Sequence, residues 1–332
     1  MRVTMKNLRP KEYQMTYKKR LICLLSITGV LALLYIGSFI FNYDKNSVRS
    51  SSYTWLDPKA AEKTTRIVIT AEGQDPIDFI KKNDKWFSVT KGNEYPVRAV
   101  RVEDFLNILT TRSSWPVRSS SSSSYEGFGL GDDSPRITVY GEFGIILDII
   151  IGYDDIMGKE TYIRKAGQSE VRSGESGIKS FLSNSLTSWY NIRLIPESES
   201  GGVDASSVQR LTVYNDGETQ IFTRNKRGWD ISGITVENPD FAGIDSYIGN
   251  VVNMEGEDFL DSGSVSDYTY DHSRFVLELG NGRIITIRMS APDEMNKRYA
   301  QVSNSSYTYI IPLWTTVRIF RKAENFQISI EE

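Results

Sequence analysis

The chain has very little of two residue types on which much protein chemistry depends. Its 332 residues include one cysteine, Cys23, and one histidine, His272. A single cysteine excludes an intramolecular disulfide, and so few thiol and imidazole groups argue against a zinc site. Any Ser-His-Asp or Cys-His nucleophilic site would have to use His272. Because His272 lies between Asp271 and Ser273 just before an expected strand, we expect it to be a surface turn residue.

Charge is unevenly distributed along the chain. The net charge is -3, but residues 1–42 hold seven Lys or Arg against one Glu, which gives +6 and leaves -9 for the rest. An acidic body argues against binding nucleic acid through a basic face, so we predict no nucleic-acid partner. Hydrophobic residues make up 39% and charged residues 24%, as in ordinary folded proteins.

One long stretch has no charged residue at all. Residues 21–41, from Leu21 to Phe41, would span about 30 Å as a helix, the thickness of the hydrocarbon core. The flank before it ends Lys18-Lys19-Arg20, and the positive-inside rule places this basic side in the cytoplasm. We therefore predict a cytoplasmic tail over 1–20, one transmembrane helix over 21–41 that binds the lipid bilayer, and an extracytoplasmic C-terminal part.

Two other structures for this stretch fit less well. A cleaved signal peptide has an apolar region of about 7–15 residues and a small-residue cleavage site. Here the apolar run is longer and ends with Phe39, Ile40 and Phe41. A buried core helix would show polar positions on one face, and none is seen. The pattern favours an uncleaved signal-anchor.

The remainder divides into two similar units. Residues 42–62 are polar and aperiodic, which predicts a tether, and the acidic, Gly-containing residues 197–202 predict a linker. These breaks define a first unit over 63–196 and a second over 203–332. Six short patterns recur in order at an offset near 140 residues, beginning with Arg66–Ile69 and Arg210–Val213 and followed by the segments that hold Trp86 and Trp229. Such a series indicates a tandem repeat.

Each unit reads as antiparallel strands with a few helices. The first strand pair of the second unit surrounds Asn215-Asp216-Gly217, a strong hairpin signal. Apolar residues at helical spacing follow over 102–109 and 241–252, and then a second strand pair, a further strand and a short helix. Strands joined by tight turns predict antiparallel sheets and an α+β class.

The order of motifs in the first unit resembles a known family. The motifs are Asp84–Phe87, Tyr125–Leu130, Pro135, Ile151-Gly152 and Thr161–Arg164. Their order is similar to that of the bacterial domain of unknown function 4340 over residues 64–195, and more loosely over the second unit. The resemblance implies a protein anchored in a bacterial inner membrane by one N-terminal helix, with a periplasmic body, that serves an ABC-type transporter complex. It implies no catalytic residue.

Other candidate motifs are better explained by structure than by chemistry. Ser176 and Lys179 fit the S-x-x-K nucleophile pattern, but its companion elements are absent. The glycines of 127–131 lack phosphate-loop spacing and predict a turn. The acidic pairs at 132–133, 154–155 and 257–258 lack the spacing of a calcium loop and predict solvated turns. We therefore predict no catalytic residue, no cofactor and no metal site.

Tryptophan and serine supply the last sequence signals. Because Trp86 and Trp229 recur at one place in the repeat, we expect both to be core anchors. Four others are expected to be freer and to mark an interface: Trp55, Trp115, Trp189 and Trp314. The serine run at 119–124 predicts a mobile, solvated loop.

Together these observations predict a non-enzymatic, single-pass extracytoplasmic accessory or scaffold subunit of an ABC-type transporter complex. Two alternatives remain open. One is a cell-envelope enzyme or glycan-binding protein, and the other is an assembly protein of the division or secretion type.

Overall fold

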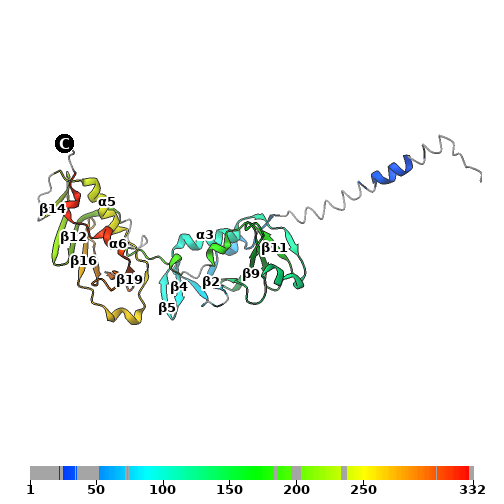
Figure 1. Ribbon diagram of the computed structural model, residues 1–332, viewed down its shortest axis with the longest axis horizontal. Coiled ribbons are helices and arrows are strands. Elements are labelled where there is room, and N and C mark those ends of the chain that lie inside the picture. The colour runs from blue at the N-terminus through cyan, green and yellow to red at the C-terminus, as the bar shows by residue number, and fades with distance from the viewer. Residues whose placement is uncertain are drawn as a thin grey trace, which may run out of the picture.

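A computed structural model describes residues 22, 25–33, 35, 52–71, 73, 75–182, 186–195, 203–232, 238–303 and 305–328. Residues 52–195 form the first domain and residues 203–328 the second, and the two lie end to end (Figure 1). Each domain has one large antiparallel sheet with helices packed against it. The predicted α+β class is confirmed.

The first domain contains a nine-stranded sheet in which every neighbouring pair is antiparallel. Two meanders meet where β2 pairs with β8, and β7 returns to the far edge. In spatial order the strands are β5 (Asn93–Pro96), β4 (Lys85–Thr90), β3 (Ile77–Lys82), β2 (Thr64–Thr70), β8 (Arg136–Gly141), β9 (Gly144–Asp154), β10 (Thr161–Lys165), β11 (Val171–Gly174) and β7 (Val117–Ser119).

The second domain repeats this order without a counterpart of β5 among its described residues. Its strands are β14 (Gly228–Ser232), β13 (Glu218–Asn225), β12 (Val208–Asn215), β16 (Ser273–Leu279), β17 (Ile284–Met289), β18 (Arg298–Val302), β19 (Thr308–Ile311) and β15 (Asp258–Phe259). The shared strand order agrees with the repeat in the sequence.

Local chemistry explains the hairpins and helices. Asp216 and Gly217 both adopt positive φ, as a tight two-residue turn requires, and β12 and β13 pair on either side of them. The side chain of Asp240 accepts a hydrogen bond from the Gly243 N–H and so caps the following helix. The helices are α2 (Pro58–Ala61), α3 (Ala99–Thr110), α5 (Phe241–Val252) and α6 (Leu313–Ile319).

One apolar face of each main helix packs on its sheet. Helix α3 buries Val102, Phe105 and Leu109, which are spaced three and four residues apart. Helix α5 likewise buries one face against the second sheet (Figure 1). Short 3₁₀ turns complete the domains: Ser122–Ser124, Glu126–Phe128, Ile178–Phe181, Leu186–Ser188, Ala205–Ser207, Ser262–Asp267 and Ala323–Phe326.

An aromatic seam joins the two domains. Tyr95 of β5 stacks on Phe259 of β15 with ring centroids 4.9 Å apart and also contacts Tyr190 and Tyr307. The Arg98 guanidinium lies 3.9 Å from the Glu255 carboxylate across the same junction. The strand that distinguishes the first sheet from the second, β5, is therefore the one that contacts the second domain.

The prediction of a tether over 42–62 is wrong for its described residues, 52–62, which are part of the first domain. Strand β1 (Ser52–Tyr53) pairs with β6 (Ser113–Ser114), and Trp55 and Leu56 are buried in the first core. The main chain of Leu56 also donates to the carbonyl of Leu109 at 2.9 Å. Apolar contacts and strand pairing thus fix residues that look polar and aperiodic in sequence.

The predicted transmembrane segment lies largely outside the described residues. Of residues 21–41, only Ile22, residues 25–33 and Tyr35 are described; they are helical, and their large apolar side chains are exposed. Within the part of the chain that the structure describes, no helix combines the length and apolarity needed to cross a membrane.

The tryptophans divide differently from the prediction. Trp86 and Trp229 are buried at matching places in the two sheets, as predicted. Trp55, Trp115 and Trp189 are also core residues of the first domain, so the expectation that they are free is wrong for these three. They lie outside the regular repeat and bury their rings against one another or against other aromatics. Trp314 is 56% exposed, as expected.

Candidate functional site

The motif Tyr125–Leu130 forms a compact turn against the first sheet. Gly129 has φ +66°, a left-handed conformation that favours glycine, and the next residue, Leu130, is fully buried. Arg164 of β10 is also buried, and its guanidinium donates to the Leu130 carbonyl at 3.3 and 3.4 Å. The same guanidinium lies 4.1 Å from the Tyr125 ring centroid. Strand β10 therefore holds both ends of the motif.

Two glycines let this turn lie directly on β9. A Cβ atom at Gly152 would lie 2.2 Å from the carbonyl oxygen of Phe128, so no side chain fits there. A Cβ atom at Gly129 would lie 2.7 Å from the Tyr153 ring. The glycines of the motif thus serve close packing, and the prediction of a turn over 127–131 is confirmed.

This packing leaves a cavity of about 630 Å³ beside the motif, within the size range of small-ligand sites. Three carboxylates line it, those of Glu126, Asp132 and Asp133, together with the 63% exposed ring of Tyr153. Lys179 also lines it, and its ammonium group pairs with Asp154 at 3.0 Å. We call this space the motif cavity. Its lining offers hydrogen-bond acceptors and one aromatic face to a polar ligand.

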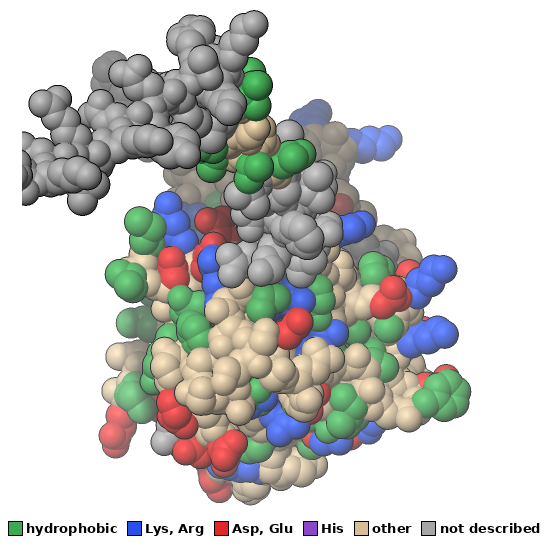
Figure 2. Space-filling model, turned by 90° about the vertical axis from the view of Figure 1, so that its right-hand side faces the viewer, with side chains coloured by type: hydrophobic (Ala, Val, Ile, Leu, Met, Phe, Trp, Pro, Cys, Tyr) green, Lys and Arg blue, Asp and Glu red, His purple; other side chains and the backbone are tan. Residues whose placement is uncertain are grey.

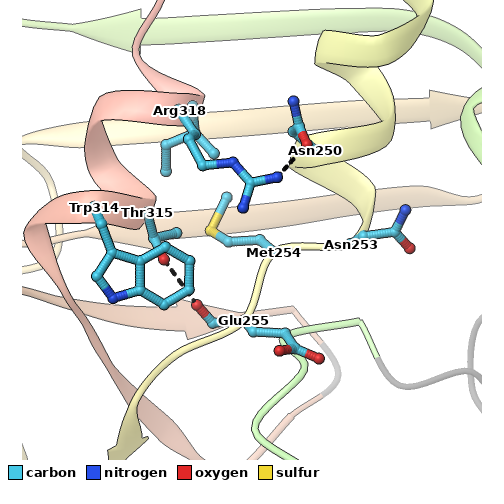
Figure 3. Close-up of a pocket in the computed structure, with 8 residues that line it drawn as sticks. Asn250, Asn253, Met254, Glu255, Trp314, Thr315 and Arg318 are labelled. Carbon is cyan, nitrogen blue, oxygen red and sulfur yellow. Dashed lines mark hydrogen bonds between the residues drawn. The ribbon is translucent and has the colours of Figure 1, made fainter.

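A second recess lies between α5 and α6 in the second domain (Figure 3). Arg318 donates to the Asn250 side-chain oxygen at 2.7 Å, and the Thr315 hydroxyl donates to the Glu255 carbonyl at 3.3 Å. The recess has about 80 Å³, room for only two or three water molecules. It is therefore too small for an organic ligand, although Trp314 lies at its rim.

The structure does not bring the predicted nucleophile candidates together. His272 lies in the second domain, where its Nε2 is 2.9 Å from Asp216 Oδ1 on the β12–β13 turn. Ser176 lies in the first domain, and its hydroxyl accepts a hydrogen bond from the Ile178 N–H. Lys179 pairs with Asp154 instead of Ser176.

Of the acidic pairs, only Asp132 and Asp133 both lie in a turn, as predicted. The prediction of solvated turns is wrong for the other two pairs, because Asp154 ends strand β9 and the partly buried Asp258 begins strand β15. Asp155 accepts hydrogen bonds from the Lys159 and Glu160 N–H groups, which lower the pKa of its carboxyl group. Glu257 pairs with Lys297. Across the described residues no three metal-ligating side chains cluster.

The serine run over 119–124 is mostly exposed, and Ser122–Ser124 form a 3₁₀ turn. The Ser124 hydroxyl donates to Ser119 Oγ and lies 2.7 Å from the Ser121 carbonyl. Short serine side chains can satisfy their own turn in this way, which composition alone does not reveal.

Comparison with known proteins places the chain in a family. A family model for a domain of unknown function, DUF4340, matches residues 86–273, more than half of the chain. The chain belongs to the DUF4340 family. No curated protein and no solved structure gives a significant match to the chain.

The DUF4340 match runs from Trp86 in β4 to Ser273 in β16. It therefore covers parts of both domains, whereas the sequence motifs suggested the best fit over 64–195. Most of the motif cavity falls inside the match. The sequence does not mark Arg164 or Tyr153 as parts of this site. Arg164 ends the Thr161–Arg164 motif, but it is followed by Lys165 in the same strand, so its burial has no local signal.

Proposed function

We propose that this DUF4340 protein is a single-pass, membrane-anchored extracytoplasmic subunit that acts by binding, as an accessory or scaffold component of an ABC-type transporter complex. The transporter association rests on what the family resemblance implies, and the anchor rests on the uncharged stretch over 21–41 and its basic flank.

The observation that carries the proposal is the arrangement of the chain. Only ten residues separate Phe41 from Ser52, and from Ser52 onward the chain is packed into two domains joined by an aromatic seam. A body tied so closely to its anchor stays near other proteins of the same membrane. Tethering raises its effective concentration there, so modest contacts suffice for assembly.

A binding role fits the chemistry of the described residues. The side chains that a nucleophilic mechanism would need are separated between the domains or engaged with other partners: His272 with Asp216, and Lys179 with Asp154. The motif cavity has acceptors and an aromatic face but, among its described lining residues, no nucleophile paired with a base.

The direct test is crosslinking in cells followed by purification in mild detergent. We expect the ATP-binding and membrane-spanning subunits of a transporter to co-purify. A matched control replaces residues 21–41 with an unrelated apolar helix: retention of the partners would place recognition in the two domains, and their loss would place it in the anchor. Recovery of division or secretion components instead would contradict the transporter assignment.

Glycan binding is a second candidate function, favoured by the motif cavity. An exposed ring next to several carboxylates is suited to stacking and hydrogen bonding with a sugar. Titration with soluble cell-wall fragments should give saturable binding that Tyr153→Ala weakens and Tyr268→Ala, outside the cavity, does not. Equal effects of both substitutions would argue against the cavity.

A further inference from the structure

The segment that leads into each domain docks in the same way. In the first domain, β1 pairs with β6, and Tyr53 lies opposite Ser113. In the second domain, Arg193 lies opposite Glu255. Ser113 and Glu255 each lie three residues beyond the end of the main helix, α3 or α5. The repeat therefore includes its lead-in segment.

The two domains differ in what precedes their lead-in segments in the chain. For the second domain, the preceding body is the first domain, which contacts it through Tyr95 on Phe259 and Tyr307. For the first domain, the preceding element is the anchor segment over 21–41. The corresponding face of the first domain is therefore the face turned toward the anchor.

The residues at this face change type between the domains. In the second domain Phe259 of β15, a residue of the aromatic seam, pairs with Tyr309 of β19, and the two ring centroids are 5.2 Å apart. In the first domain the matching strands are β7 and β11, and Val117 pairs with Arg172. Where the second domain has an aromatic pair beside its contact with the first domain, the first domain has a pair that includes a cation.

Further cations surround this position. The Arg172 guanidinium lies 4.2 Å and the Lys165 ammonium 5.5 Å from the Tyr53 ring centroid. Arg112 is exposed and donates to the Ser52 hydroxyl at 2.7 Å. We call these four residues, Tyr53, Arg112, Lys165 and Arg172, the entry face. Glu170 neutralises Arg172 at 2.6 Å, so the entry face carries a net charge of about +2 from Arg112 and Lys165.

Figure 2 views the first-domain end of the molecule, where Lys and Arg side chains are interspersed with Asp and Glu side chains. The body as a whole is acidic, because residues 43–332, which include the entry face, carry -9. Attraction to an anionic surface is therefore confined to local groups of cations such as the entry face.

We propose that the entry face rests on the anionic phospholipid headgroups of the membrane that holds the anchor. The inference rests on the proposed anchoring. The ten residues over 42–51 span at most about 36 Å when fully extended and about 18 Å as a flexible coil. Headgroup charge acts over about 8–10 Å at physiological salt, and a tether of this length allows the entry face to approach the surface that closely. Tyr53 adds an amphipathic ring of the kind found at membrane interfaces.

The test uses the full chain in nanodiscs. Cys23→Ser removes the native thiol, and Ser114→Cys places a fluorophore at the exposed edge of β6. Discs contain phosphatidylcholine alone or with phosphatidylglycerol, plus a lipid that carries a quencher on its headgroup. A second labelling site, Lys226→Cys on the β13–β14 turn, reports on the second domain. In anionic discs we expect strong quenching at position 114 and little at position 226. Added salt should abolish the quenching at position 114.

The charge variant is Arg112→Gln with Lys165→Gln. Each Lys or Arg near an anionic surface contributes about 1 kcal/mol, so loss of both should lower the docking equilibrium roughly 30-fold. Lys85→Gln with Lys91→Gln is the matched control, because it removes two exposed charges beside β4 at the opposite edge of the same sheet. Thermal unfolding of both variants checks that the fold is retained.

The outcomes separate this inference from the proposed function. Quenching that is equal in neutral and anionic discs, or that resists the charge variant, would overturn headgroup docking while leaving the anchor intact. Failure of the chain to enter discs would overturn the anchoring, and the inference with it.

Discussion

The aromatic seam gives the sharpest test of how the two domains are joined. Tyr95→Ala removes three ring pairs, with centroid distances of 4.9 Å to Phe259, 5.4 Å to Tyr190 and 6.2 Å to Tyr307. Such pairs contribute about 0.5–1.5 kcal/mol each beyond burial. Two of these pairs, those to Phe259 and Tyr307, cross the domain boundary, whereas Tyr190 belongs to the first domain. Because Tyr95 is only partly buried, we expect a loss in the lower half of the sum of the two crossing pairs, about 1.5 kcal/mol of coupling between the domains.

Two measurements report on this coupling. Denaturant unfolding of the wild type should be cooperative across both domains, and Tyr95→Ala should separate it into two transitions. Distances between spin labels placed on the two domains should broaden in the variant. Tyr153→Ala, an exposed tyrosine away from the seam, is the control. A variant that unfolds within 0.5 kcal/mol of wild type, with unchanged distances, would refute the idea that the ring contacts hold the domains together.

Three further predictions concern single sites. Burial, reinforced by Glu257, raises the pKa of Asp258, so its ionised form destabilises the fold at pH 7. Asp258→Asn should therefore raise the free energy of unfolding at pH 7, with a difference from wild type that shrinks as pH falls toward the ordinary aspartate pKa of about 4; a constant difference would contradict this. Gly152→Ala should destabilise the first domain by about 1–3 kcal/mol, because its methyl group meets the Phe128 carbonyl, and unchanged melting would be inconsistent with that packing. His272→Ala should change stability by less than about 1 kcal/mol, because the contact that it makes with the exposed Asp216 lies at the surface, and should leave transporter co-purification intact; loss of function without unfolding would revive an enzymatic role.

Much of the fold follows from local sequence pattern. The helix expected over 241–252 occurs with those bounds, since its apolar spacing is regular and Asp240 caps its start. The hairpin at Asp216-Gly217 also follows, because few residues besides these adopt positive φ readily. In both cases the deciding interactions lie within a few residues, where a sequence pattern can report them.

The missed features depend on partners distant in sequence. Strand β15 has two residues and exists because Phe259 pairs with Tyr309, fifty residues later. Strand β1 exists because Ser113 and Ser114 pair with it, about sixty residues away. Neither has a hydrophobic period of its own, so only the assembled sheet reveals it.

The candidate site was even less accessible to sequence reasoning. The Tyr125–Leu130 motif was recognised, and its turn was predicted from its glycines. The buried contact of Arg164 with the Leu130 carbonyl was not, because nothing local marks an arginine as buried. The motif cavity depends on how that turn and β9 pack, which no single segment determines.

The proposed topology places two folded domains outside the cytoplasm, held there by one apolar stretch. Protease added to intact spheroplasts is the decisive experiment, with inside-out vesicles as the reciprocal control. We expect digestion of residues 52–332 from the outside and survival of a small membrane-held fragment that contains Cys23. A body that resists digestion until the cells are lysed, or that is recovered free of membrane, would contradict it.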